Sequence, residues 1–276
     1  MFEMFKLEFI TQAFLLSVIT GLVLSYLGVH VVGRGIVFVD LALGQISSLG
    51  VAFSDYIGKW QTSIPIVFTL LGAFLLSFIN IRDKRLKQEA IIGILYAIAS
   101  ATTVMLISKT PHGDSDIQEV LFGNILSVNA EKIKMVGIVF GIIALLHFVF
   151  RKKFFDLTQR YENGEGHSIG IFNTWNFLFY ITIGLSIVFA VRMNGVIPVF
   201  SYLIIPAVSA MLISRKSSAV VVIAILLSVV GAFFGLNVSY HYDFPAGSSI
   251  VAMLGAVFFI AALVRLVKDF AVRKKV

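Results

Sequence analysis

The chain contains no cysteine, and only 13% of its residues are charged. Without cysteine, disulfides, zinc–thiolate sites and thiol catalysis are all excluded. The motifs GxxxxGKS or GxxxxGKT, GxGxxG after a strand, HExxH and GxSxG are also missing, and the five histidines show no ligand spacing such as HxxxH. The sequence therefore holds no recognisable nucleotide site or hydrolase constellation. Any energy source must be a gradient or another subunit.

Apolar sequence, in contrast, is abundant. Hydrophobic residues make up 58% of the 276 residues and the mean hydropathy is +0.96, whereas soluble domains carry about 25% charged residues. This composition is typical of a polytopic membrane protein. The apolar segments are residues 9–32, 36–56, 62–80, 90–108, 133–150, 175–191, 196–213, 219–236 and 247–267. We expect an all-α membrane bundle of nine spans, or eight if Pro198 and Pro206 make 196–213 a broken or re-entrant element.

The basic residues indicate the orientation of these spans. If the C-terminus is inside, sixteen of the 22 lysines and arginines lie on the cytoplasmic side, as the positive-inside rule requires. They are Arg34 and the basic residues of 82–87, 151–160, 215–216 and 265–275. The excess of basic residues is thus explained by topology rather than by a nucleic-acid partner. A multi-pass membrane protein with its C-terminus inside is predicted.

One predicted span, RGIVFVDLALGQISSLGVA from Arg34 to Ala52, contains an unusual acid. Asp40 is the only carboxylate well inside an apolar segment, and such acids are expensive in a membrane. At about 100° per residue, one side of this helix carries polar and small residues. They are Asp40, Gly44, Ser47 and Ser48, with Gln45 at the margin. The stripe predicts a translocation path; the alternative is close helix packing, with Asp40 bonded to a partner near the membrane surface.

Two connections are longer than turns. Residues 151–174, RKKFFDLTQRYENGEGHSIGIFNT, form the largest cytoplasmic segment within a single domain spanning 1–276. Its glycines fit turns that flank a short helix, and the segment is either a solvated linker or a docking element. The external connection 109–132 carries Asp114, Asp116 and Glu119, which could steer a cation or pair with a basic partner.

Four stretches resemble the membrane subunits of bacterial ABC importers for zinc, manganese and iron. The span from Phe38 to Ala52 is similar to that family's GDALSHAxLPGVA helix. The others are LFGNILSV at 121–128, similar to LFGxxLxV; LIIPAVSA at 203–210, similar to LLIIPAxxA; and SYHYDFPAGSSIV at 239–251, similar to SYxxDxPxGxxIV. The four lie in the family's order over nearly the whole chain, so the chain is identified as a member of that family.

The resemblance implies a transport subunit rather than an enzyme. It implies a dimer of permeases, with a second copy of this chain, surrounded by lipid and served by an extracytoplasmic metal-binding protein. A cytoplasmic ABC ATPase would bind the ATP, and the permease itself would hold no intrinsic cofactor, only the transported divalent metal. The 151–174 connection occupies the place of the family's coupling segment. The residues expected to contact the ATPase are Asp156, Leu157, Gly170 and Ile171.

The chain departs from the family motif at the expected metal contacts. The motif's Asp and the His four residues later fall on Leu41 and Gln45, while Asp40 lies one position early. An amide is a poorer zinc ligand than imidazole, so Asp40 is predicted as a transient contact for manganese or ferrous iron in a divergent branch. A different class of function also fits the acid, namely an ion- or proton-coupled secondary carrier with Asp40 as the relay.

Overall fold

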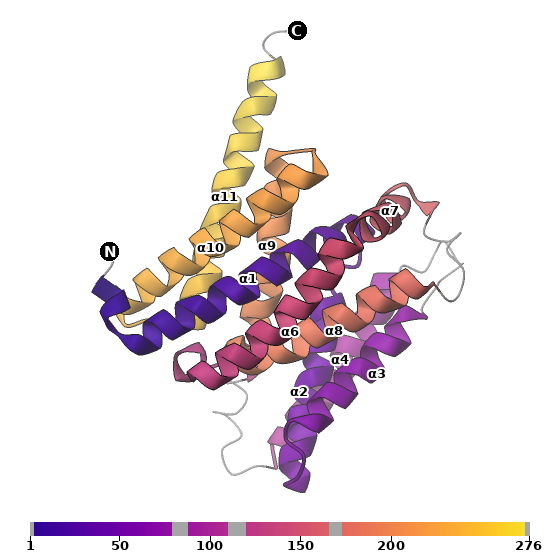
Figure 1. Cartoon of the computed structure of the whole chain (residues 1–276), viewed down its shortest axis with the longest axis vertical. Helices are drawn as coiled ribbons and strands as arrows, with labels where there is room; N and C mark the ends of the chain where they lie inside the picture. The colour runs from indigo at the N-terminus through magenta and orange to yellow at the C-terminus, as the bar shows by residue number, and fades with distance from the viewer. Residues whose placement is uncertain (1–2, 79–87, 110–119, 166–172, 274–276) are drawn as a thin grey trace. The chain divides into compact units, whose positions relative to one another are not determined.

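The computed structural model describes residues 3–78, 88–109, 120–165 and 173–273, and every regular element in these ranges is a helix (Figure 1). In chain order they are η1 (Glu3–Lys6), α1 (Glu8–Arg34), α2 (Val39–Ile57), α3 (Ser63–Ser77), α4 (Gln88–Ile107), η2 (Ile125–Ser127), α6 (Ala130–Val149), α7 (Arg151–Glu162), α8 (Thr174–Asn194), α9 (Val196–Ile213), α10 (Ser217–Tyr242) and α11 (Ala246–Arg273). The all-α fold class is confirmed.

Each of the nine apolar segments coincides with one helix of the described chain. Seven helices are long and apolar enough to cross a membrane, namely α1, α4, α6, α8, α9, α10 and α11. Helix α3 is apolar but has only 15 residues, about 22 Å, less than the roughly 30 Å of a bilayer's hydrocarbon. Helix α2 has 19 residues and is not among the seven; its acid, amide and serines lower its hydropathy.

Helix α9 is continuous in spite of its prolines. Pro206 lies inside the helix, whereas Pro198 lies in the first turn, where a missing N–H has no intrahelical acceptor to lose. The alternative of a broken or re-entrant element at 196–213 is therefore not what the structure shows.

Contacts between residues divide the chain into two compact units, and each unit is made of several separate stretches of sequence. The first comprises Met1–Val32, Ile125–Gly137 and Phe200–Val276; the second comprises Gly33–Asn124 and Ile138–Val199. The division falls inside α1, α6 and α9, so it does not separate two consecutive domains.

The first unit is held together by small apolar residues. Its buried cluster joins α1, α9 and α10 through Val29, Ala207, Ala210, Val220 and Ala224. Helix α10 packs on α11, where a Cβ at Gly235 would lie 2.5 Å from the Ile250 Cα. Small residues of this kind let membrane helices approach closely.

The second unit is organised around α2. Helix α2 packs against α3, α4 and α8, and α8 also contacts α3 and α7. A Cβ at Gly50 would lie 2.7 Å from the Pro65 Cα, so α2 and α3 meet almost backbone to backbone. Nearly every side of α2 is therefore covered by its own chain, and this helix positions the candidate site.

Candidate functional site

Asp40 lies in the first turn of α2, which begins at Val39. Hydropathy alone placed it well inside an apolar segment, but Gly35, with φ +67°, ends the preceding helix and delays the start of α2. The first N–H groups of a helix lack intrahelical partners and favour nearby negative charge. A second carboxylate lies near this end of α2: Glu89 Oε1 accepts a hydrogen bond of 3.1 Å from the Val37 N–H.

The α2 polar stripe, which we define as Asp40, Gly44, Gln45, Ser47 and Ser48, is buried within the chain. Asp40 is 2% exposed, and neither of its carboxylate oxygens has a side-chain hydrogen-bond partner among the described residues. The Ser47 hydroxyl is likewise unpartnered there, whereas Ser48 donates to the Gly44 carbonyl at 3.0 Å. Buried polar groups are normally paired, so this stripe has oxygen atoms to offer to a cation or to water.

The stripe faces the junction of α8 and α9. A Cβ at Gly44 would lie 3.4 Å from Val196 Cγ1 and 3.7 Å from Val191 Cγ2, on either side of that junction. The opposite side of α2 carries apolar residues and is only partly exposed: Phe38 and Phe53 are exposed, but Leu43 is fully buried. The predicted stripe residues are therefore brought together, and whether they line the path stays a prediction.

The junction itself contains residues that sequence reasoning missed. Asn194, 1% exposed, donates from Nδ2 to the Ala190 carbonyl at 3.1 Å, and its Oδ1 has no partner in the described chain. Gly195 ends α8 with φ +80°. Gly123, with φ +67°, packs its backbone directly on that of Asn194 and Gly195. The Asn-Gly pair between two apolar runs is a turn signal that could have located this junction.

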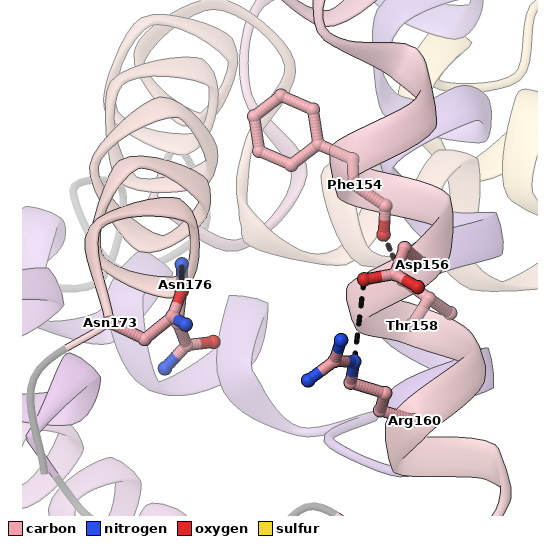
Figure 2. Close-up of polar contacts among 6 residues, drawn as sticks. All are labelled: Phe154, Asp156, Thr158, Arg160, Asn173 and Asn176. Atoms are coloured by element: carbon pink, nitrogen blue, oxygen red, sulfur yellow. Dashed lines mark hydrogen bonds and ion pairs between the residues drawn. The ribbon is translucent and has the colours of Figure 1, made fainter. Parts of the chain in front are cut away.

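Helix α7 occupies residues 151–162 of the predicted coupling segment, and one side of it is buried. Phe154, Leu157 and Thr158 are buried, whereas Asp156 is exposed and pairs with Arg160 at 3.3 Å (Figure 2). Leu157 is only 4% exposed, so its side chain holds α7 to its own chain rather than offering a contact to a partner.

Some predicted contact residues cannot be placed. Gly170 and Ile171, together with Asp114, Asp116 and Glu119 of the external connection, lie outside the described residues. Within the described ranges, no group of three or more His, Cys, Asp or Glu side chains is arranged to hold a metal ion. The transient metal contact at Asp40 stays a prediction.

In the sequence, Arg34 is only one of the basic residues that indicate membrane orientation. In the structure its side chain is buried beside α7, and the residue is 6% exposed. Its Nε donates to Thr158 Oγ1 at 3.2 Å, and one terminal nitrogen donates to Asn176 Oδ1 at 3.2 Å. Its Cζ lies 3.7 Å from the centre of the Phe179 ring. Hydrogen bonds to charged groups contribute about 1.5–3 kcal/mol each. Burial raises the pKa of the nearby Tyr161 phenol, and the positive charge of Arg34 opposes that shift.

The comparisons with known proteins agree with this architecture. A model described as the ABC 3 transport family matches residues 6–265, and the chain belongs to that family. It is 29% identical over 259 residues to the manganese transport system membrane protein MntC of Listeria monocytogenes, covering 93% of this chain and 90% of that one. It is 27% identical over 272 residues to the chelated iron transport system membrane protein YfeD of Yersinia pestis, covering 95% and 87%.

A solved structure gives the same result. A chain of PsaBC from Streptococcus pneumoniae, in complex with Fab, superposes with a TM-score of 0.77 at 26% identity, covering 93% of this chain and 91% of that one. The chain is thus a multi-pass membrane subunit of a bacterial ABC metal-ion importer, and the ATPase of such a transporter is a separate subunit. The resemblance found in the sequence is confirmed, and the secondary-carrier alternative is wrong.

Proposed function

We propose that two copies of this chain form a path for manganese or ferrous iron, with the α2 polar stripe as its narrow, ion-contacting part. The observation that carries this proposal is the buried Asp40 carboxylate, which has no side-chain partner among the described residues. A buried carboxylate is costly unless a cation or hydrogen bonds compensate it, and a passing divalent ion would do so. Carboxylate, hydroxyl and amide oxygens are better ligands for manganese than they are for metals that prefer sulfur.

The relatives support the same range of substrates. The Listeria protein is named for manganese and the Yersinia protein for chelated iron. An extracytoplasmic metal-binding protein delivers the ion, and a cytoplasmic ATPase drives the cycle from the α7 side.

The choice of metal is tested by uptake in proteoliposomes that contain the permease, its ATPase and the metal-binding protein. Manganese and ferrous iron are expected to enter in an ATP-dependent manner, with zinc accumulating at least about tenfold more slowly, because the stripe offers oxygen ligands and no imidazole. Preferential uptake of zinc would contradict the assignment of α2 as the selective element.

The ATPase contact is tested by cysteine crosslinking, which is clean here because the chain has no native cysteine. Cysteines at the exposed positions Asp156 and Gln159 are expected to crosslink to the ATPase. A cysteine at the buried Leu157 serves as the matched control and should not react. Crosslinking from loop 82–89 in place of both α7 positions would refute the docking assignment.

A further inference from the structure

Arg34 joins α7 to the membrane helices through directional contacts. It is the last residue of α1, and its guanidinium donates both to Thr158 on α7 and to Asn176 on α8. We propose that Arg34 is the positioning residue that turns a displacement of α7 into a displacement of α1 and α8; this inference rests on the proposed docking of the ATPase on α7.

The end of α1 lies directly against two side chains of α7. A Cβ at Gly33 would lie 2.6 Å from Glu162 Oε1 and 2.7 Å from Thr158 Cγ2. A larger side chain at Gly33 would push the Glu162 and Thr158 side chains aside. A movement of the second half of α7 would therefore act on the last turn of α1.

On the far side of Arg34, the contacts continue into two more helices. Asn176 lies in the first turn of α8, next to the cap in which Asn173 Oδ1 accepts from the N–H groups of Trp175 and Asn176 at 3.0 Å each. Figure 2 shows Asn173 and Asn176. The Asn176 Nδ2 reaches the carbonyl of Ser77, at the end of α3, at 3.5 Å. One chain of polar contacts thus runs from α7 through α1 and α8 to α3.

The rest of the attachment of α7 is largely aromatic and not directional. Phe154 stacks on His147 of α6 with ring centroids 4.0 Å apart, and it meets Trp175 edge-on. Stacked rings resist separation but slide easily, whereas the planar guanidinium has a fixed fork of donors. Arg34 therefore fixes the direction in which α7 can move its neighbours.

Stability alone does not explain a charge at this place. Well-packed apolar residues often replace buried ionic groups without loss of stability, and Phe179 already gives this site an aromatic wall. The continuity of α1 supplies a reason for the charge. The helix is unbroken over its 27 residues. A displacement imposed at Arg34 would therefore act on α1 through its last turn.

The inference is tested in the reconstituted transporter by measuring metal ions transported per ATP hydrolysed, alongside crosslinking from Gln159→Cys to the ATPase. Arg34→Met is expected to lower the transport ratio about tenfold or more, within the usual range of coupling between sites, while the crosslink and ATP hydrolysis persist. Thr158→Val should lower the ratio less, and Arg34→Lys should restore part of it. The control is Arg265→Met, which removes a solvent-accessible arginine paired only along its own helix with Asp269.

The outcomes separate this inference from the docking proposal. An unchanged transport ratio in Arg34→Met would overturn the role of Arg34. If Arg34→Met instead lost the crosslink, ATP hydrolysis and uptake together, the inference would also be overturned, because Arg34 would then only hold α7 in place. If Arg34→Met does not fold, wild-type ratios in both Arg34→Lys and Thr158→Val would overturn it. Absence of the crosslink with Arg34 intact would instead refute docking on α7, and this inference with it.

Discussion

Replacing Asp40 with asparagine is expected to abolish metal uptake while the transporter still assembles and hydrolyses ATP. The amide keeps the size of the side chain and removes the charge that would attract a divalent ion into the α2 polar stripe. Because Asp40 is 2% exposed, the wild-type protein must also bear the cost of burying this carboxyl group. We therefore expect the variant to unfold at the same or a higher temperature than the wild type.

The control for this variant lies on the same helix. Asp55→Asn makes the identical chemical change near the other end of α2, where the side chain is exposed and accepts a hydrogen bond from Gln61 at 3.3 Å. Uptake and thermal unfolding of both variants are measured in parallel, and Asp55→Asn should transport at close to the wild-type rate. An Asp40→Asn transporter that is folded, assembled and fully active would show that Asp40 only stabilises the start of α2.

The backbone at the junction of α8 and α9 should tolerate substitution poorly. Gly195→Ala is expected to destabilise the protein by about 3 kcal/mol or more, because it combines overpacking with a backbone conformation, φ +80° and ψ 166°, that essentially only glycine adopts. The added methyl group would lie 2.7 Å from the Leu121 carbonyl oxygen and would meet the Gly123 backbone. Thermal unfolding in detergent and the yield of folded protein measure the effect.

Gly58→Ala is the milder comparison. Gly58 has φ +66° and ψ 22°, the left-handed helical conformation, and a Cβ there would meet nothing within 4 Å. It should therefore cost only about 1 kcal/mol, the strain of the left-handed conformation. Equal losses at Gly58 and Gly195 would contradict both the greater backbone strain and the overpacking expected at Gly195.

The helices were predictable because hydropathy is a local property. Each apolar run coincides with one helix, and seven of these helices are long and apolar enough to cross a membrane. The start of α2 was not predictable in this way, since Gly35 to Phe38 are apolar but form a turn at the end of α1. The side of α7 that is buried was accessible in principle, because Phe154, Leu157 and Thr158 share the spacing of one helical face.

The contacts of Arg34 depend on tertiary structure alone. Its partners Thr158 and Asn176 lie 124 and 142 residues away in the sequence. No local sequence pattern distinguishes an arginine in a solvent-exposed cytoplasmic loop from one that is buried between helices. Asn194 was missed for a different reason, because an Asn-Gly turn signal carries no information about which backbone will pack on it.

If the proposed path is correct, the burial of the α2 polar stripe also bears on how the resting transporter behaves. In this conformation Asp40, Ser47 and Ser48 are covered by their own chain. If the proposed path runs along this stripe, it is shut at that point without help from any gate in the loops. An idle importer would then not let accumulated metal leak back out of the cell, and would hold a steep concentration difference at no expense of ATP.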